Sequence, residues 1–419
     1  MRSWVRLDNA AKIFPVVSNK HRTNLFSIAF TLNELVDPVV LQEALQLTIM
    51  RFPSFRMRLR SGFFWFYLED NKQMPIVEKE NAHILEPIDK YQSRGYLFRV
   101  VYFENKITME VFHTLTDGYG ATEFMKALVY CYLNLLDKNI ESEGKILIDD
   151  ENIHEKIQDS FQKIYDERVK PDRTEERALH FVGTEYDNYW LSVITGIVSR
   201  QQFKELITRF NCTYTQFMVG LLTYCANKVP YLLEKDKYPF QVFVAVDLRR
   251  LFTSKSLRNF SMIVKTSMKL NPNMPLEEYV RIAKEQLTER ISEKYLLPRV
   301  IGNIKYEKMW LLRIVPLVLK KIALKIGYTR ASTKADSLCI SNLGDICLPT
   351  EMQKYVKKII FSNGAMKETP INMGVTYYND SIFMTFTSSI LERDFQKVFF
   401  RELVNLGLDV TLENNDLEA

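Results

Sequence analysis

The spacing of apolar residues in the first third of the chain predicts helices alternating with hairpins. Apolar side chains recur at helical spacing through residues 36–52. Two pairs of apolar segments, within residues 55–69 and 96–113, are each interrupted by a short polar turn, which predicts two β-hairpins. Helical spacing returns over residues 121–136. This part of the chain therefore has the pattern of an α+β domain.

The second half repeats that pattern. Two helices are predicted within residues 199–229, and a closing helix over 392–407 is stopped by Gly407. Apolar segments typical of strands lie at 240–248, 260–270, 337–341, 357–363, 372–379 and 382–390. The predicted fold class is α+β, with mixed sheets and helices in each half.

A highly charged segment separates the two halves. Residues 138–185 contain few large apolar side chains, so we interpret them as a solvated connection that carries a helix or two. The predicted domains are 1–170 and 186–419, and the connection overlaps the end of the first. A chain of 419 residues is long enough for two such domains.

Composition narrows the functional classes. Hydrophobic residues make up 47% of the chain and charged residues 26%, as in folded soluble proteins. The net charge of +5 is too diffuse to indicate nucleic-acid binding. The N-terminus lacks a signal-peptide pattern, and no apolar run is long enough to span a bilayer. Five cysteines at wide spacings suggest reduced thiols, so we expect a cytoplasmic protein.

One histidine stands where a predicted strand meets a helix. Alternation over residues 107–113 places His113 on the same face as three apolar side chains, and Asp117 and Gly118 follow shortly afterwards. An imidazole held there, with an ordinary pKa near 6.5, could act as a general base. On these residues alone, an ordinary Asp-Gly turn beside a hydrogen-bonded histidine is the favoured explanation.

The stretch VFHTLTDGYGATEF, residues 111–124, resembles the HxxxDG signature of the CoA-dependent acyltransferase superfamily, which includes chloramphenicol acetyltransferases and the condensation domains of peptide synthetases. LDNAAKIFP before this stretch, and VDLRRLFTSKSLRNF and SNLGDICLP after it, occur in the expected order along the chain and resemble the alcohol acetyltransferase-like branch of low-GC bacteria. There are two departures. Phe112 stands where many relatives have a second histidine, and the DFGWG motif of the plant branch is missing.

The resemblance implies two chloramphenicol acetyltransferase-like domains with a channel between them. Acyl-CoA would enter from one side as a co-substrate, with no cofactor bound permanently, and a small-molecule acceptor from the other. His113 would take the proton of the acceptor, Asp117 would pair with an arginine as an architectural group, and Gly118 would be the motif glycine. Acetyl transfer to a hydroxyl is the favoured reaction, and transfer to an amine is an alternative. A donor on a separate carrier protein, or a non-catalytic binding role, also stays open.

Other polar residues are candidates for the same site. Arg249 follows a predicted strand and could pair with Asp117 or bind a CoA phosphate, and Arg51 and Arg56 are rival partners for Asp117.

A second group of candidates could face the channel. Asn259, Ser341 and Asn342 carry amides or a hydroxyl that could reach it or stabilise an oxyanion. For Asn342 we favour a turn role with Gly344. The remaining histidines lack ligand spacing, so no metal site is predicted.

The most apolar segment, residues 307–328, carries several basic residues and Pro316 as a break. It could be an interfacial helix that makes peripheral contact with an acidic membrane. We favour the alternative that it forms a buried or channel-lining helix pair with exposed lysines.

Overall fold

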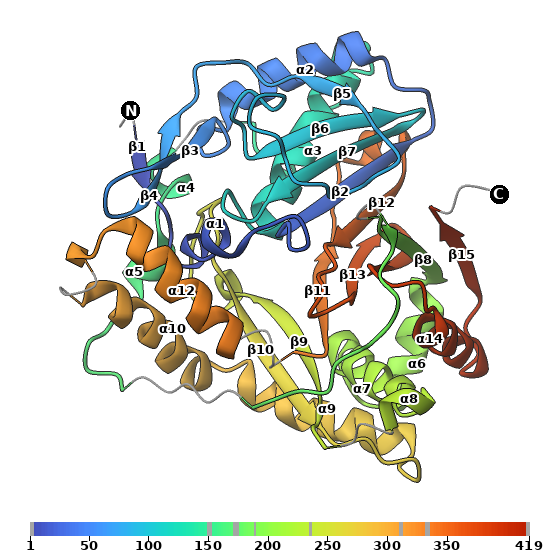
Figure 1. The fold of residues 1–419 in the computed structure, drawn as a ribbon. Coiled ribbons are helices and arrows are strands. Elements are labelled where there is room, and N and C mark those ends of the chain that lie inside the picture. Colours follow the sequence, from blue (N-terminus) through green and yellow to red (C-terminus); the bar gives the residue numbers. More distant parts are fainter. Residues whose placement is uncertain are drawn as a thin grey trace.

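The computed structural model describes residues 4–148, 153–170, 176–187, 190–233, 237–309, 313–331 and 336–415. Its strands form three sheets, of five, seven and three strands (Figure 1). Helices and strands are mixed in both halves of the chain, as the predicted α+β class requires. Both predicted hairpins in the first third are present as antiparallel pairs.

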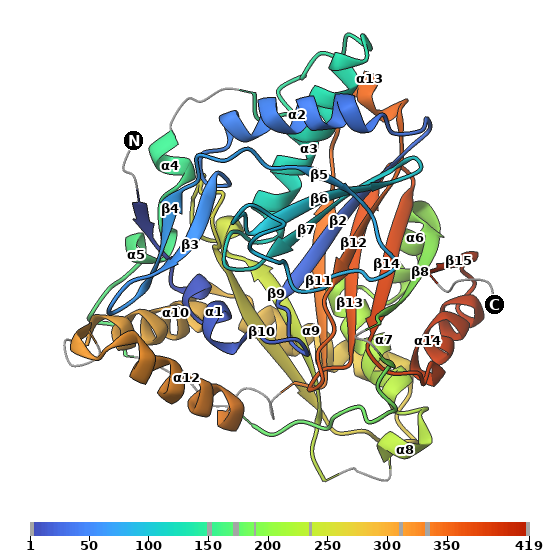
Figure 2. The ribbon, with the colours of Figure 1, turned by 45° about the horizontal axis from the view of Figure 1, so that its top comes forward.

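The five-stranded sheet has the order β12-β2-β7-β6-β5. Its strands are β12 (Val356–Asn363), β2 (Leu25–Leu32), β7 (Lys106–Phe112), β6 (Phe98–Phe103) and β5 (Val77–Lys79). Two helices that pack against each other, α2 (Pro38–Arg51) and α3 (Gly118–Leu135), cover one face of this sheet (Figures 1 and 2). Nearly every side chain of β2 and β7 is buried, which makes these strands the centre of the first core.

The seven-stranded sheet has the order β10-β9-β11-β13-β14-β8-β15. Its strands are β10 (Ser261–Met268), β9 (Phe240–Asp247), β11 (Leu338–Asp345), β13 (Ile371–Tyr378), β14 (Ser381–Ser388), β8 (Ser192–Ser199) and β15 (Val410–Asn414). Helices α6 (Arg200–Arg209), α7 (Tyr214–Ala226), α9 (Leu276–Arg290) and α14 (Asp394–Asn405) belong to this half (Figure 1). As predicted, the last helix ends before Gly407, whose φ of +92° suits a residue without a Cβ.

The remaining elements are shorter or lie at the edge of the molecule. The small sheet consists of β1 (Trp4–Arg6), β4 (Phe66–Asp70) and β3 (Met57–Ser61). The other α-helices are α1 (Phe14–Val17), α4 (Ile153–Lys156), α5 (Ser160–Lys163), α8 (Pro230–Leu233), α10 (Glu293–Lys308), α12 (Leu317–Ala331) and α13 (Thr350–Gln353). Two 3-10 helices, η1 (Ala10–Lys12) and η3 (Leu248–Arg250), complete the described elements that matter for the site.

Strand β12 ties the two large sheets together. It pairs with β2 in the first sheet, although the sequence division at residue 186 assigns it to the second half. Side chains of β13, in the second sheet, bond to its backbone: Thr376 Oγ1 donates to the Ile359 carbonyl over 2.6 Å, and the Tyr378 hydroxyl to the Val356 carbonyl over 3.1 Å. The two halves therefore share a hydrogen-bonded contact between sheets.

The charged connection is less solvated than the sequence suggests. It carries two short helices, α4 and α5, in agreement with the interpretation of residues 138–185. However, Phe161, Leu179 and Phe181 are each at most 4% exposed and belong to the second core. A few apolar side chains at wide spacing are enough to fix a connection, and such a sparse pattern is hard to recognise from composition.

Helix α12 departs from the favoured expectation for residues 307–328. Lys320 is only 5% exposed, whereas Val318 is 69% and Ile322 55% exposed. The expectation of a buried helix is therefore wrong, because most of its aliphatic side chains face outward, and only part of the expectation for the lysines holds, since Lys325 is exposed and Lys320 is buried. The structure does not describe residues 310–312 of this segment.

Candidate active site

His113 directly follows the central strand of the five-stranded sheet. Ile107, Met109 and Val111 of β7 are all completely buried, so the predicted alternation toward one apolar face is confirmed. The backbone amide of His113 donates to the carbonyl of Asn24 over 3.1 Å, which continues the pairing of β7 with β2 by one step. The strand pairing thus fixes where the histidine side chain leaves the sheet.

Two phenylalanines hold the imidazole ring. Phe14 of α1 stacks on it at a centroid distance of 5.0 Å and an interplanar angle of 18°, and Phe26 of β2 lies 4.6 Å away at 53°. The Nδ1 atom is buried, while the residue as a whole keeps part of its surface exposed. Neither phenylalanine was among the sequence candidates, because nothing in the pattern of residues 14 and 26 distinguishes them from ordinary core aromatics.

Burial lowers the pKa of His113 below its usual value of 6.5. The negative charge of Asp117, the side-chain amide of Asn259 and the backbone of Thr116 act in the opposite direction but do not cancel the effect of burial. A lowered pKa keeps the imidazole neutral at pH 7. A neutral ring can accept a proton from a hydroxyl, amine or thiol.

The carboxylate of Asp117 joins the two halves of the molecule. Its Oδ1 accepts the Gly120 amide over 3.2 Å, so Asp117 is the N-cap of α3. Its Oδ2 accepts the Phe260 amide over 2.8 Å and also lies 2.8 Å from Nη1 of Arg249. Both charged side chains are almost fully buried, at 5% exposure for Asp117 and 7% for Arg249. Asp117 thus pairs with an arginine, whereas its architectural role in the site remains a prediction.

The structure distinguishes among the three candidate arginines. Arg249 also binds the carboxylate of Asp247, and it donates to the carbonyls of Ser256 and Arg258 over 2.9 and 2.6 Å. Arg56 pairs instead with Asp70, at 3.0 Å, and Arg51 lies exposed in the last turn of α2. The rival pairings of Asp117 with Arg51 and Arg56 are therefore wrong.

The loop before β10, which Arg249 holds through the carbonyls of Ser256 and Arg258, contacts His113 and the residues after it. Asn259 Nδ2 donates to the backbone carbonyl of His113 over 3.0 Å, and Thr116 Oγ1 donates to the Leu257 carbonyl over 2.5 Å. Asn259 thus contacts the histidine through its backbone, and a channel-facing role for its amide remains a prediction. The loop before β10 encloses the HxxxDG stretch from the side of the second half.

Near its end, β11 approaches the start of α3, where the Leu343 side chain lies against Gly118. A Cβ built on Gly118 would overlap Cδ2 of Leu343, so the motif glycine permits a close approach of this strand. Asn342 has a turn role, as favoured: its Oδ1 accepts the Gly344 amide over 2.8 Å, while Nδ2 donates to the Tyr377 hydroxyl over 3.1 Å. Ser341 is partly exposed in the same strand, and its role toward an oxyanion is not tested by this geometry.

A second buried charge cluster lies next to the site, and none of its carboxylates was among the residues predicted for the site. Asp8 is completely buried, accepts the Ala11 amide over 2.7 Å and lies 3.3 Å from Nη2 of Arg258. Burial raises the pKa of Asp8, and the charge of Arg258 opposes that rise. Asn259 Nδ2, which donates to the His113 carbonyl, also donates to Oδ2 of Asp8 over 3.4 Å. The only available signal was the polar residue inside the stretch LDNAAKIFP.

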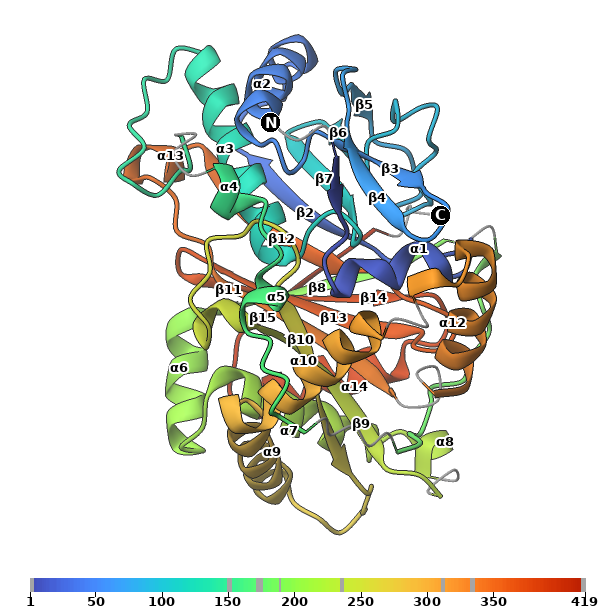
Figure 3. The same ribbon diagram turned by 90° about the vertical axis from the view of Figure 1, so that its left-hand side faces the viewer.

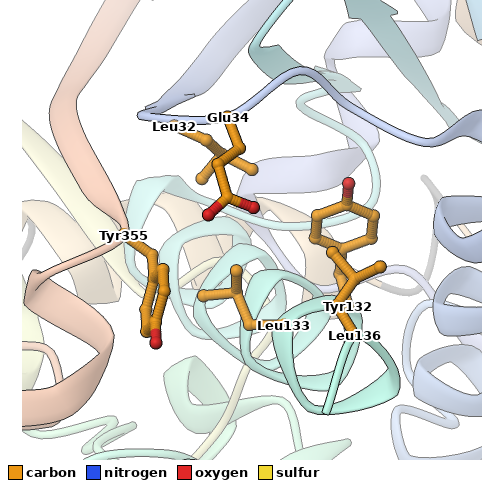
Figure 4. Close-up of a pocket in the computed structure, with 6 residues that line it drawn as sticks. All are labelled: Leu32, Glu34, Tyr132, Leu133, Leu136 and Tyr355. Atoms are coloured by element: carbon orange, nitrogen blue, oxygen red, sulfur yellow. The ribbon is translucent and has the colours of Figure 1, made fainter. Parts of the chain in front are cut away.

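The described cavities lie away from these residues. The pocket in Figure 4, lined by Leu32, Glu34, Tyr132, Leu133, Leu136 and Tyr355, has a volume of about 10 Å³, which is room for about one water molecule. A hollow of about 500 Å³ lies between α6 and the end of α14, lined by Gln202, Glu205, Arg209, Leu406, Gly407 and Leu408. Neither involves a predicted site residue, so the channel at His113 stays a prediction.

Two further observations apply to the described residues. Within them, no group of three or more His, Cys, Asp or Glu side chains is arranged to hold a metal ion. Across the same segments, no helix combines the length and apolar character needed to cross a bilayer.

Comparison with known proteins gives results at the level of structure only. No protein-family model matches the sequence, and no curated protein matches it closely enough to count as a relative. TRI101 of F. graminearum, solved with coenzyme A and deoxynivalenol, superposes with a TM-score of 0.66 at 10% identity over 99% of this chain and 100% of its own.

Two other solved structures superpose over almost the entire chain. A variant of the starter condensation domain of rhizomide synthetase RzmA, in complex with C8-CoA, gives a TM-score of 0.60 at 12% identity, covering 98% of each chain. Polyketide synthase associated protein 5 from Mycobacterium tuberculosis also gives 0.60, at 11% identity, covering 96% of this chain and 97% of its own. At such identities the likeness establishes the fold. The chain therefore has the two-domain α+β fold of these proteins, which confirms the predicted fold class.

Proposed function

We propose that this protein transfers an acyl group from acyl-CoA to a small-molecule acceptor, with His113 as the general base. The observation that carries the proposal is a histidine whose pKa is lowered by burial, held between Phe14 and Phe26 where the two halves of the chain meet. Coenzyme A complexes of TRI101 and C8-CoA complexes of the RzmA domain, on the same fold, support an acyl-CoA donor.

The proposed reaction is direct transfer, without an acyl-enzyme. His113 removes the proton of an acceptor hydroxyl as its oxygen attacks the thioester carbonyl. The new C–O bond forms, the C–S bond breaks, and the imidazolium returns the proton to the leaving thiolate, which gives free CoA. Neutral His113 is the form that this step needs. Binding both substrates beside the ring supplies the proximity. The HxxxDG resemblance and its alcohol acetyltransferase-like branch favour a hydroxyl over an amine and acetyl over longer acyl groups.

Asp117 and Arg249 act in this proposal without touching substrate. Their buried pair fixes the start of α3 and the loop that carries Asn259, and Asn259 fixes the backbone of His113. Arg249 is fully engaged by Asp117, Asp247 and backbone carbonyls, which favours this structural role over binding a CoA phosphate. Positioning of the histidine is thus assigned to contacts from both halves of the molecule.

Release of free thiol from acetyl-CoA, followed with a panel of alcohols and amines, tests the proposal. The His113→Ala variant should lose at least about 100-fold in kcat/KM, as expected when a general base is removed. His21→Ala is the matched control, because His21 is an exposed histidine in the N-terminal part of the chain, and its activity should equal that of the wild type. Acceptor-dependent turnover in His113→Ala at the wild-type rate contradicts the general-base role.

The likeness to condensation domains supports a second candidate, in which the acyl donor is bound to a carrier protein. The RzmA domain and the condensation domain of the polyketide synthase MokA share this fold. Parallel assays with an acyl-CoA and with the same acyl group on a carrier protein separate the two. Turnover restricted to the carrier-bound donor favours condensation. A wild-type protein that binds CoA without turning over any donor indicates a binding role.

A further inference from the structure

Helix α12 presents its aliphatic side to solvent. It lies at the edge of the molecule in all three views (Figures 1, 2 and 3). Val318, Leu319, Ile322 and Ile326 are 69%, 57%, 55% and 47% exposed. Their spacing of one, three and four residues places them on one side of the helix. A surface helix ordinarily buries such a side.

Two basic side chains of α12, Lys320 and Lys321, point the other way, toward the protein, whereas Lys325 is exposed. Lys320 Nζ donates to the Phe64 carbonyl over 2.9 Å and lies 3.5 Å from the centroid of the Trp65 ring. Lys321 Nζ lies 4.6 Å from the centroid of the Phe66 ring. These contacts of Lys320 and Lys321 attach the helix to the hairpin of β3 and β4. The apolar side of the helix therefore faces outward.

The tip of that hairpin extends the apolar surface. Phe63 and Phe64 are 72% and 41% exposed, and the Leu317 amide donates to the Phe63 carbonyl over 2.8 Å. Ile314, just before α12, is 57% exposed. We call this surface the α12 face; its members are Phe63, Phe64, Ile314, Val318, Leu319, Ile322 and Ile326. Apolar patches of this kind mark binding surfaces on otherwise polar proteins.

The charge of the surrounding segment indicates what covers this face. Residues 309–335 contain no Asp or Glu and six basic residues, namely Arg313, Lys320, Lys321, Lys325, Arg330 and Lys334. Of these, Arg313 and Lys325 are exposed beside the apolar side chains. Exposed aliphatic and aromatic side chains next to exposed basic groups suit the boundary between lipid headgroups and acyl chains, where the basic groups can reach anionic headgroups. A second copy of the chain would bring two such basic segments together, and their repulsion opposes that pairing.

We propose that the α12 face docks the protein on the surface of an anionic lipid bilayer. The proposal does not depend on the acyl-transfer reaction. It has a geometric consequence for the candidate site, because α1 packs against α12 and its Phe14 stacks on His113. Docking through α12 would hold the histidine one element away from the lipid surface, where a lipophilic acceptor would be concentrated.

Sedimentation of the full chain with vesicles tests the docking. We expect binding to vesicles of phosphatidylcholine with about a third phosphatidylglycerol, and at least about fivefold weaker binding to phosphatidylcholine alone. The double variant Val318→Ser/Ile322→Ser should bind the anionic vesicles at least about tenfold less tightly, because it lacks two aliphatic side chains that docking would bury in the bilayer. Lys325→Glu should reduce binding to the anionic vesicles by about fivefold or more.

The matched control is Val39→Ser/Leu47→Ser, which removes two exposed apolar side chains of α2, at 76% and 43% exposure, and should bind like the wild type. The proposal is overturned if wild-type protein stays in the supernatant with anionic vesicles, or if both double variants bind equally. Light scattering that finds a wild-type dimer and a monomeric Val318→Ser/Ile322→Ser variant would also overturn it, because a second copy would then cover the face. None of these readouts uses enzymatic activity, so they remain separate from the test of acyl transfer.

Discussion

At the scale of single residues, opposing effects set the proton affinity of His113. Burial between Phe14 and Phe26 disfavours the imidazolium, and this effect is larger than the stabilisation that the charge of Asp117 offers. A base poised in this way is neutral over the physiological range.

The pH dependence of turnover follows from the lowered pKa. Protonated His113 cannot act as a base, so activity is lost as the pH falls through the folded-state pKa. Since that pKa lies below 6.5, kcat/KM should be flat from about pH 8 to about 6.5 and fall only at lower pH. A pH–rate profile with saturating acyl-CoA checks this. An acid limb centred above pH 7 would contradict the assignment.

The same shift bears on stability, with the sign set by the unfolded chain. Below pH 6.5 the unfolded state binds the His113 proton while the folded state still resists it. The contribution of His113 to the free energy of unfolding is therefore complete above pH 6.5 and is lost as the pH falls toward the folded-state pKa. In the His113→Ala variant this part of the pH dependence should disappear.

At the scale of elements, the junction of β7 and α3 depends on two glycines that differ in their surroundings. A Cβ on Gly118 would overlap only the end of the Leu343 side chain, which can rotate away. A Cβ on Gly120 would overlap the carbonyl oxygen of Leu257, and this backbone is held by Thr116. The sequence analysis singled out Gly118, whereas the packing makes Gly120 the more restrictive position.

The pair Gly118→Ala and Gly120→Ala tests this difference. Both changes add a methyl group to the first turn of α3, so the gain in helix propensity is similar. Gly120→Ala should lower the free energy of unfolding by about 1–3 kcal/mol, as overpacking against fixed backbone does, and Gly118→Ala by less than about 1 kcal/mol. Urea or thermal unfolding of both variants provides the measurement. Equal losses would mean that the Leu257 carbonyl yields as easily as the Leu343 side chain.

At the scale of the whole molecule, a buried ion pair and a shared strand join the two halves. Asp117 belongs to the first half and Arg249 to the second, and the loop bonded to Arg249 reaches His113 through Asn259. On another side, β12 of the first sheet receives hydrogen bonds from β13 of the second. The position of His113 therefore depends on contacts from both halves of the chain.

Asp117→Asn should weaken that assembly and lower activity. The asparagine can still cap α3, but it leaves the buried Arg249 with Asp247 as its remaining carboxylate. Removing one partner of a buried pair costs several kcal/mol, and we expect about 2–4 kcal/mol here because Asp247 compensates in part. Thermal unfolding and the thiol-release assay provide the two measurements.

The matched control for Asp117→Asn is Asp345→Asn, which breaks the exposed pair of Arg200 and Asp345. Side chains in that pair are 46% and 41% exposed, so its loss should cost less than about 1 kcal/mol. If both variants unfold alike, the buried pair does not hold the halves together.

The sequence by itself determined many of the secondary-structure elements and the position of the histidine at the end of a strand, although it did not identify β2, β8, α9 or β15. Alternation along β7 requires only local sterics, and it correctly placed Ile107, Met109 and Val111 on one buried face that ends at His113. The two hairpins, the helix after the Asp-Gly pair and the stop at Gly407 likewise follow from neighbouring residues. Together with the α+β class, these features are encoded over short distances along the chain.

Only the tertiary structure decided which distant residues meet. It selected Arg249 over Arg51 and Arg56, placed Phe14 and Phe26 on the imidazole, and carried β12 into the sheet of the first half. It also turned the aliphatic side of α12 outward, because its lysines find carbonyl and aromatic partners on the hairpin of β3 and β4. A periodic pattern shows that a helix has two sides. Which side is buried depends on the surface that the rest of the chain presents to it.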